Sequence, residues 1–187
     1  MMTMTVEAAI GIYTVAELEQ ERERDERSRW ELLGGELVMT PAPSTVHQRL
    51  SFRLAVSLDA AAGNDLEVFP APYDVHLSEH TVLQPDVVLA AADQIMDDGI
   101  HGAPVLAVEV LSPSTRRRDL VQKREILERA GCPHYWVLDP DKMSLWVWRL
   151  VKGTYVLEHH VTGDEEVRLT VPVEVTLRVS DLMGTSP

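Results

Sequence analysis

Two apolar, β-branched runs joined by a helical segment place the strongest constraint on this chain. The runs are APVLAVEVLS (103–112) and HYWVLDP (134–140). Continuous apolar runs of this kind are typical of strands buried on both faces of a sheet. The segment between them begins at Ser114 or Thr115, either of which can cap a helix, and ends at Gly131. A strand, a helix and a second strand in this order predict a right-handed crossover between parallel strands, and therefore an α/β fold.

Two further helices are predicted before this crossover unit. Thr14 and Glu17 have the spacing of a capping box and begin a charged helix over 14–29. Apolar side chains at every fourth residue predict an amphipathic helix over 44–62, with Gly63 as its C-cap. The charged helix is expected to be solvated scaffolding, whereas the amphipathic helix is expected to pack on the sheet.

The remaining strands are indicated by short runs rich in Val and Leu. Gly34 and Gly35 separate two such runs, which predicts a β-hairpin over 31–41. Three more strands are expected at 66–69, 73–77 and 84–90. The last 47 residues, 141–187, alternate apolar and polar side chains between turn residues, which predicts additional antiparallel strands. We expect a single domain over 1–187.

Three acidic residues occupy positions where a carboxylate is energetically unfavourable unless it binds something. They are Asp86 in QPDVVLA, Glu109 in VLAVEVLSP and Glu36 beside the Gly-Gly turn. Strand parity places Glu109 and Leu111 on one face, opposite Val110. Two adjacent strands that present Asp86 and Glu109 to one point would form an oxygen-rich site suited to Mg²⁺ or Mn²⁺.

The predicted helix after Glu109 carries a local basic face. Residues 116–129 contain six basic and three acidic side chains, whereas the whole chain has 17 basic and 30 acidic residues and a net charge of -13. Lys123 lies in the second turn, where it can reach back toward the carboxylates and stabilise a developing charge on phosphorus. The guanidinium groups predicted to bind phosphate are those of Arg116, Arg117 and Arg118.

Several segments together resemble the putative restriction endonuclease family, a bacterial branch of the PD-(D/E)XK nuclease superfamily. They are GELVMTPAPSTVHQRL (35–50), Pro85-Asp86, VEVLSPSTRRRDL (108–120), Lys123 and AGCPHYWVLDP (130–140). The resemblance covers about residues 30–140. It implies a restriction-endonuclease-like α/β core, a central mixed β-sheet flanked by helices, with 141–187 as a C-terminal β extension.

The resemblance also implies an activity and a set of site residues. The activity is metal-dependent cleavage of phosphodiesters in nucleic acid, with DNA as the expected substrate. Asp86 and Glu109 would be the Mg²⁺ or Mn²⁺ ligands, Glu36 an accessory acid and Lys123 the catalytic lysine. The superfamily motif has lysine two residues after the acid, where this chain has Leu111. Lys123 would occupy the space of that lysine.

Two side chains are candidates for orienting groups around the metal. His47, near the start of the second helix, would donate a hydrogen bond to a metal ligand or relay a proton. Gln122 would orient water beside Lys123. The other histidines show no spacing typical of a metal site. They are His76, His80, His101, His134, His159 and His160.

Composition bounds the alternatives. The chain has one cysteine, Cys132, lacks an apolar run that would span a membrane, and lacks a basic leader, so we expect a cytoplasmic protein.

By analogy with enzymes that cut both strands of a duplex, we expect a homodimer or higher homo-oligomer. Leu111 and the acidic net charge keep two alternatives open: a catalytically weakened binding or regulatory module, and a carboxylate-metal enzyme acting on a small phosphorylated substrate.

Overall fold

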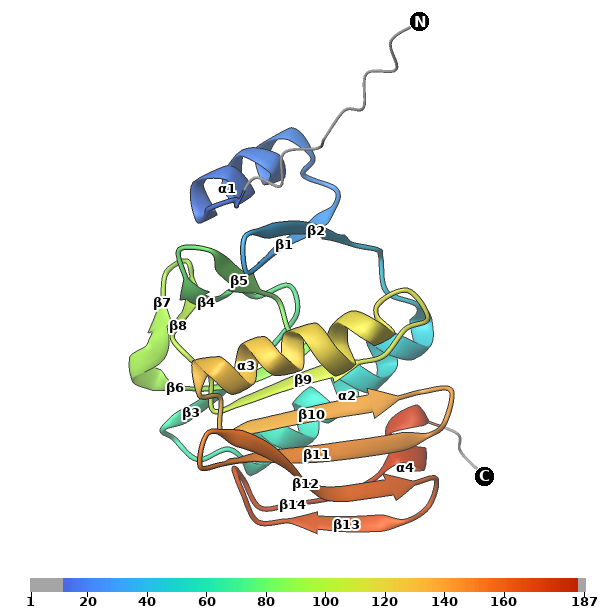
Figure 1. Cartoon of the computed structure of the whole chain (residues 1–187). Coiled ribbons are helices and arrows are strands. Elements are labelled where there is room, and N and C mark those ends of the chain that lie inside the picture. The colour runs from blue at the N-terminus through green and yellow to red at the C-terminus, as the bar shows by residue number, and fades with distance from the viewer. Residues whose placement is uncertain (1–11, 185–187) are drawn as a thin grey trace, which may run out of the picture.

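The computed structural model describes residues 12–184 as two six-stranded mixed sheets, a two-stranded sheet and flanking helices. Figure 1 shows the central sheet crossed by a helix, with the second sheet and the first helix toward one end. The α/β fold class with additional antiparallel strands near the C-terminus is confirmed. The strands assigned to one central sheet divide between two.

The central sheet has the strand order β12-β11-β10-β9-β6-β3. Its strands are β3 (Leu66–Pro70), β6 (Val87–Ala91), β9 (Leu106–Val110), β10 (His134–Asp139), β11 (Ser144–Val151) and β12 (Thr154–Thr162). β9 and β10 are parallel, as the crossover predicts, and all other neighbours in this sheet are antiparallel. The helical segment between β9 and β10 is the π-helix η2 (Arg118–Lys123) followed by α3 (Arg124–Ala130).

The second sheet has the order β2-β1-β5-β4-β8-β7. Its strands are β1 (Arg29–Leu33), β2 (Glu36–Thr40), β4 (Val75–Ser78), β5 (Thr81–Leu83), β7 (Ile95–Met96) and β8 (Gly99–His101), with the 3₁₀ helix η1 (Ala92–Gln94) before β7. β1 and β2 form the predicted hairpin. Gly34 and Gly35 have φ of 62° and 88°, the conformation for which a Gly-Gly turn is suited.

The remaining elements close the ends of the molecule. They are α1 (Val15–Arg24), α2 (Thr45–Ala61), β13 (Glu166–Leu169), β14 (Val175–Arg178) and α4 (Val179–Met183). α1 begins as predicted, because the Glu17 carboxylate accepts the backbone N–H of Thr14 at 2.7 Å. It ends at Arg24, earlier than predicted. No helix within the described residues is long and apolar enough to cross a membrane.

The two faces of the central sheet bury different partners. Leu106, Val108 and Val110 pack with α2, β13, β14 and α4. On the other face, Ala107 and Leu111 pack with α3 and the β1–β2 hairpin. The strand parity predicted from the sequence is therefore correct, and it directs Glu109 toward the face covered by η2 and the hairpin.

Two local predictions are wrong. The strand expected over 84–90 begins later, at Val87, because Pro85 has no N–H to donate to a ladder and separates β6 from β5, which ends at Leu83. Gly63 does not cap α2. The C-cap is Ala62, which is extended with φ of -67° and ψ of 136°, so the helix ends without a left-handed residue.

Candidate active site

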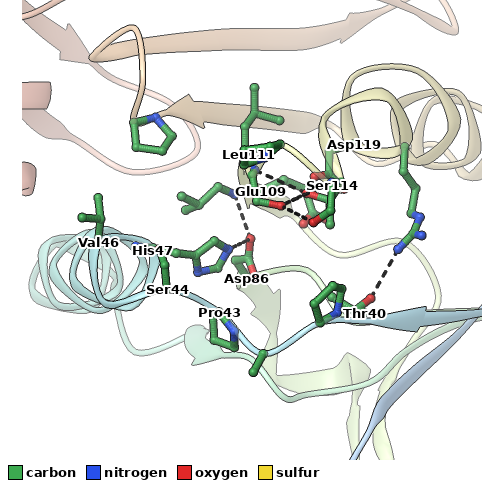
Figure 2. Close-up of a pocket in the computed structure, with 18 of the residues that line it drawn as sticks. Thr40, Pro43, Ser44, Val46, His47, Asp86, Glu109, Leu111, Ser114 and Asp119 are labelled. Atoms are coloured by element: carbon green, nitrogen blue, oxygen red, sulfur yellow. Dashed lines mark hydrogen bonds and ion pairs between the residues drawn. The ribbon is translucent and has the colours of Figure 1, made fainter.

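A pocket of about 400 Å³ lies where α2, the β1–β2 hairpin, β9 and η2 meet. Figure 2 shows His47 and Asp86 on one side of it and Glu109, Ser114 and Asp119 on the other. We call it the acid pocket, because its lining includes Glu31, Asp86, Glu109 and Asp119 together with Lys123. These side chains come from elements far apart in the sequence.

Asp86 is held at the pocket by the break between β5 and β6. Its Oδ2 accepts the backbone N–H of Val110 at 2.8 Å and lies 3.0 Å from His47 Nε2. Burial by itself would raise the pKa of Asp86, but the contact with His47, the nearby Lys123 and the Val110 N–H lower it below the ordinary value. Asp86 is therefore a charged, oriented carboxylate.

Glu109 lies on β9, adjacent to β6, and is almost fully buried. Its Oε1 is 2.9 Å from Lys123 Nζ, and Lys123 Nζ is also 2.9 Å from Glu31 Oε1. Burial raises the pKa of Glu109 well above its ordinary value, and Lys123 offsets this only in part. For Lys123, burial would lower the pKa, but Glu109, Glu31 and Asp119 raise it above its ordinary value. Lys123 is therefore an ammonium ion bridging two buried acids.

η2 carries Lys123 inward. In a π-helix the backbone N–H groups bond to carbonyls five residues back instead of four, and such turns are frequent at functional sites. Asp119 and Lys123 are both buried on its inner side, with Asp119 Oδ1 3.9 Å from Lys123 Nζ. Burial raises the pKa of Asp119 to about 6. The Tyr135 hydroxyl donates to the Asp119 carbonyl at 2.7 Å and fixes the helix on β10.

The donor set fits a divalent cation. Within residues 12–184, Asp86 Oδ1 and Glu109 Oε2 accept no hydrogen bond, although neither is sealed from the pocket surface. Two free carboxylate oxygens are hard donors of the kind that Mg²⁺ and Mn²⁺ prefer. Five acids line the pocket, against the three lysine and arginine side chains Arg29, Arg118 and Lys123. Lys123 Nζ lies within 4 Å of Glu31, Glu109 and Asp119. The charge balance of the pocket therefore favours an added cation.

Polar groups surround the mouth of the acid pocket. Arg118 lies 3.4 Å from Thr40 Oγ1 across the opening, and the Ser112 hydroxyl is within 3.1 Å of the hydroxyls of Ser114 and Thr115. A guanidinium beside several hydroxyls can bind phosphate oxygens. Arg118 is thus the predicted phosphate-binding arginine that lines this pocket.

The sequence of this chain matches a known protein family. The family model described as "putative restriction endonuclease" (Uma2) matches residues 15–180. The chain belongs to this family. A relative, the uncharacterized protein sll1609 of Synechocystis sp., is 32% identical over 126 residues, which cover 64% of this chain and 70% of that protein.

A solved structure has a similar fold. It is the crystal structure of a putative nuclease belonging to DUF820 from Anabaena variabilis, with a TM-score of 0.64 and 18% sequence identity. The match covers 82% of this chain and 89% of that chain. The likeness extends over most of both chains, so the two sheets and their helices form an arrangement already seen in a solved protein.

Not every site residue predicted from the resemblance to this family lies in the acid pocket. Glu36 is exposed at the turn end of the hairpin, where its Oε2 accepts from Gln122 at 3.3 Å. Both line a separate surface region with Arg117, which we call the outer depression. Arg116 turns away and pairs with the buried Asp139 at 2.6 Å. Glu36, Gln122, Arg116 and Arg117 are therefore not brought to Asp86 and Glu109.

The acid that the hairpin contributes to the pocket is Glu31, which the sequence reasoning missed. Glu31 Oε1 accepts the backbone N–H of Gln84 at 2.7 Å, and its Oε2 accepts from Thr40 at 3.0 Å. A signal was present. Glu31 lies in the run WELL, between apolar neighbours, as Glu109 does in VLAVEVL.

Proposed function

We propose that the acid pocket hydrolyses phosphodiester bonds of nucleic acid, with DNA as the substrate, and that it does so with Mg²⁺ or Mn²⁺ bound. The observation that carries the proposal is the convergence of Asp86, directly before β6, and Glu109, on the neighbouring β9, on a pocket where Lys123 lies 2.9 Å from Glu109. Membership of a family described as putative restriction endonucleases supports it.

Each side chain has a distinct part in this proposal. Asp86 Oδ1 and Glu109 Oε2 would hold the cation, which supplies Lewis-acid stabilisation and an activated water. His47 keeps Asp86 charged and fixes its orientation. Lys123 would stabilise negative charge that develops on the phosphoryl oxygens, since it is an ammonium ion at the edge of the same site.

This chain lacks the lysine of the superfamily motif and has Leu111 in its place. Leu111 is buried in the apolar cluster with Leu127 and Val137 and lines the pocket as well. The ammonium group comes instead from η2, where Glu31 holds it against Glu109. We infer that Lys123 replaces the motif lysine through space, with Glu31 as its positioning residue.

A nicking assay tests the proposal. Full-length protein is incubated with supercoiled plasmid and Mn²⁺ or Mg²⁺, with EDTA as the metal-free reaction. Asp86→Asn and Glu109→Gln should each lower the rate by roughly 10³-fold or more, because a bound metal contributes several kcal/mol to transition-state stabilisation. Glu36→Gln is the matched control and should cleave at the wild-type rate, since Glu36 lies in the outer depression.

Two results would overturn the proposal. Cleavage by Asp86→Asn at the wild-type rate would mean that the nuclease activity lies elsewhere or comes from a contaminant. Binding of Mn²⁺ by the wild-type protein, lost in Asp86→Asn, without cleavage of plasmid or of an RNA of the same sequence would make the protein a binding module.

A further inference from the structure

A second group of metal-ligating side chains lies outside the acid pocket. It consists of His76 on β4, His101 on β8 and Asp98 in the turn between β7 and β8. One ligand atom from each of the three lies within 4.8 Å of the others. No side chain of this group lines the acid pocket or the outer depression.

The sheet itself brings the two histidines together. β4 and β8 are parallel neighbours, and His76 is the register partner of His101, so both side chains leave the sheet on the same face. Their rings stack with centroids 4.8 Å apart and planes 20° from parallel. Because the two histidines are 25 residues apart in sequence, local residue spacing does not predict this pair.

The turn holds Asp98 against both rings. His101 Nε2 lies 2.8 Å from Asp98 Oδ1, and His76 Nε2 lies 3.9 Å from Oδ2 and 3.2 Å from the Asp98 carbonyl. Gly99 has φ of 137°, and a Cβ there would lie 2.5 Å from the Asp74 carbonyl oxygen. Because only glycine fits this approach, the turn is pressed onto β4 and the carboxylate is presented to the Nε2 atoms.

We propose that His76, Asp98 and His101 form a binding site for a borderline first-row cation, represented by Zn²⁺, that is separate from the acid pocket. Two imidazole nitrogens and one carboxylate are a ligand set used for Zn²⁺ and its neighbours, with a remaining position open to water. Ligand atoms about 2.1 Å from a tetrahedral ion lie ~3.4 Å apart, so small rotations of these partly exposed side chains suffice. The acid pocket, with carboxylates alone, prefers harder ions.

The site would tie three segments of the second sheet together. β7 has two residues and β8 has three, so few backbone hydrogen bonds hold this edge of the sheet. A cation shared by β4, β8 and the β7–β8 turn would bind the folded chain in preference to the unfolded chain, and so raise the temperature of unfolding.

Calorimetric titration with Zn²⁺ tests the site on full-length protein from which any affinity tag has been removed. Asp86→Asn provides the background, so that the acid pocket does not contribute. In that background we expect one Zn²⁺ per chain. His76→Gln or His101→Gln should weaken the affinity at least tenfold and abolish the rise in unfolding temperature.

His159→Gln is the control, because His159 is an exposed histidine of β12 outside the group. It should bind Zn²⁺ as the Asp86→Asn parent does. Equal affinity in His101→Gln and His159→Gln, or no binding below millimolar Zn²⁺, would overturn the proposal. A crystal soaked in Zn²⁺ gives an independent measurement: an anomalous peak within coordination distance of the three side chains supports the site, and its absence contradicts it.

Discussion

The acid pocket and the outer depression share two elements, the β1–β2 hairpin and η2, and differ in what surrounds the side chains. The β1–β2 hairpin gives Glu31 to the pocket and Glu36 to the depression; η2 gives Lys123 to the pocket and Gln122 to the depression. Side chains from the same element thus enter environments of opposite kind. Glu31 is 1% exposed and Lys123 3%, whereas Glu36 is exposed.

This difference in burial decides how strongly each charged group interacts with its neighbours. Water screens Glu36, so its contact with Gln122 contributes little. In the acid pocket a buried carboxylate is costly unless a cation compensates. The raised pKa of Glu109 expresses the cost of burial, and the raised pKa of Lys123 expresses its attraction to the surrounding acids. The four predictions below test this contrast, from the largest expected effect to the smallest.

Removal of Lys123 should have the largest effect on stability. Lys123→Met leaves Glu31 and Glu109 buried without their shared cation, which typically costs about 3–5 kcal/mol of unfolding free energy. Denaturant unfolding at pH 7 with EDTA measures it. Gln122→Ala, at the adjacent position in the outer depression, should change the unfolding free energy by less than about 0.5 kcal/mol. Equal effects of the two substitutions would contradict the contrast.

Asp119 should make the stability depend on pH. Its pKa is about 6 in the folded protein and 3.8 ordinarily, so the folded state binds the extra proton between these values and stability from this group falls as pH rises. Asp119→Asn should remove that fall. The unfolding free energy of the variant relative to wild type should therefore rise by up to ~3 kcal/mol from pH 4 to pH 7.

Denaturant unfolding across that pH range measures the difference. Gln122→Ala removes a side chain that does not titrate from the same helix and should keep the wild-type pH dependence. A constant difference between Asp119→Asn and wild type would show that Asp119 titrates alike in the folded and unfolded protein.

Most of the secondary structure around the acid pocket can be predicted from the sequence, because it depends on local sequence signals. Gly34-Gly35 fixes the hairpin turn, apolar periodicity gives α2, and the parity of β9 directs Glu109 away from the α2 face. Pro85 then breaks the ladder immediately before Asp86. Each of these signals lies within a few residues of the feature it controls.

Local sequence rules do not predict which glutamate of the hairpin, Glu31 or Glu36, enters the acid pocket. Leu33 pairs with Glu36 and Glu31 pairs with Val38, so both glutamates project from the same face of the hairpin. What separates them is tertiary cover: Lys123 packs against Glu31, whereas Glu36 is exposed although its partner Leu33 is buried in the core. The parallel pairing of β4 with β8 that brings His76 to His101 is also tertiary.

His47 offers a smaller test, because it acts on Asp86 without touching the free oxygen. His47→Ala should lower plasmid cleavage by about 10–100-fold, the usual effect of removing a group that orients a metal ligand. Its loss should also raise the pKa of Asp86, so the acidic limb of the pH–rate profile should move to higher pH. His80→Ala, at a half-buried histidine of the β4–β5 turn outside the acid pocket, is the control. A lower rate with an unmoved acidic limb would assign His47 a packing role only.

Substitution of Arg118 should have the smallest effect, and it distinguishes two paths for the DNA backbone. Arg118 lines both the acid pocket and the outer depression, whereas Arg117 lines the depression only. If nucleic acid enters through the mouth near Thr40, Arg118→Ala should weaken DNA binding a few-fold and reduce the salt dependence by about one phosphate contact. Arg117→Ala should leave both unchanged. Fluorescence anisotropy of a labelled duplex at several salt concentrations measures them. The reverse pattern would place the DNA backbone over the outer depression and move its path across η2.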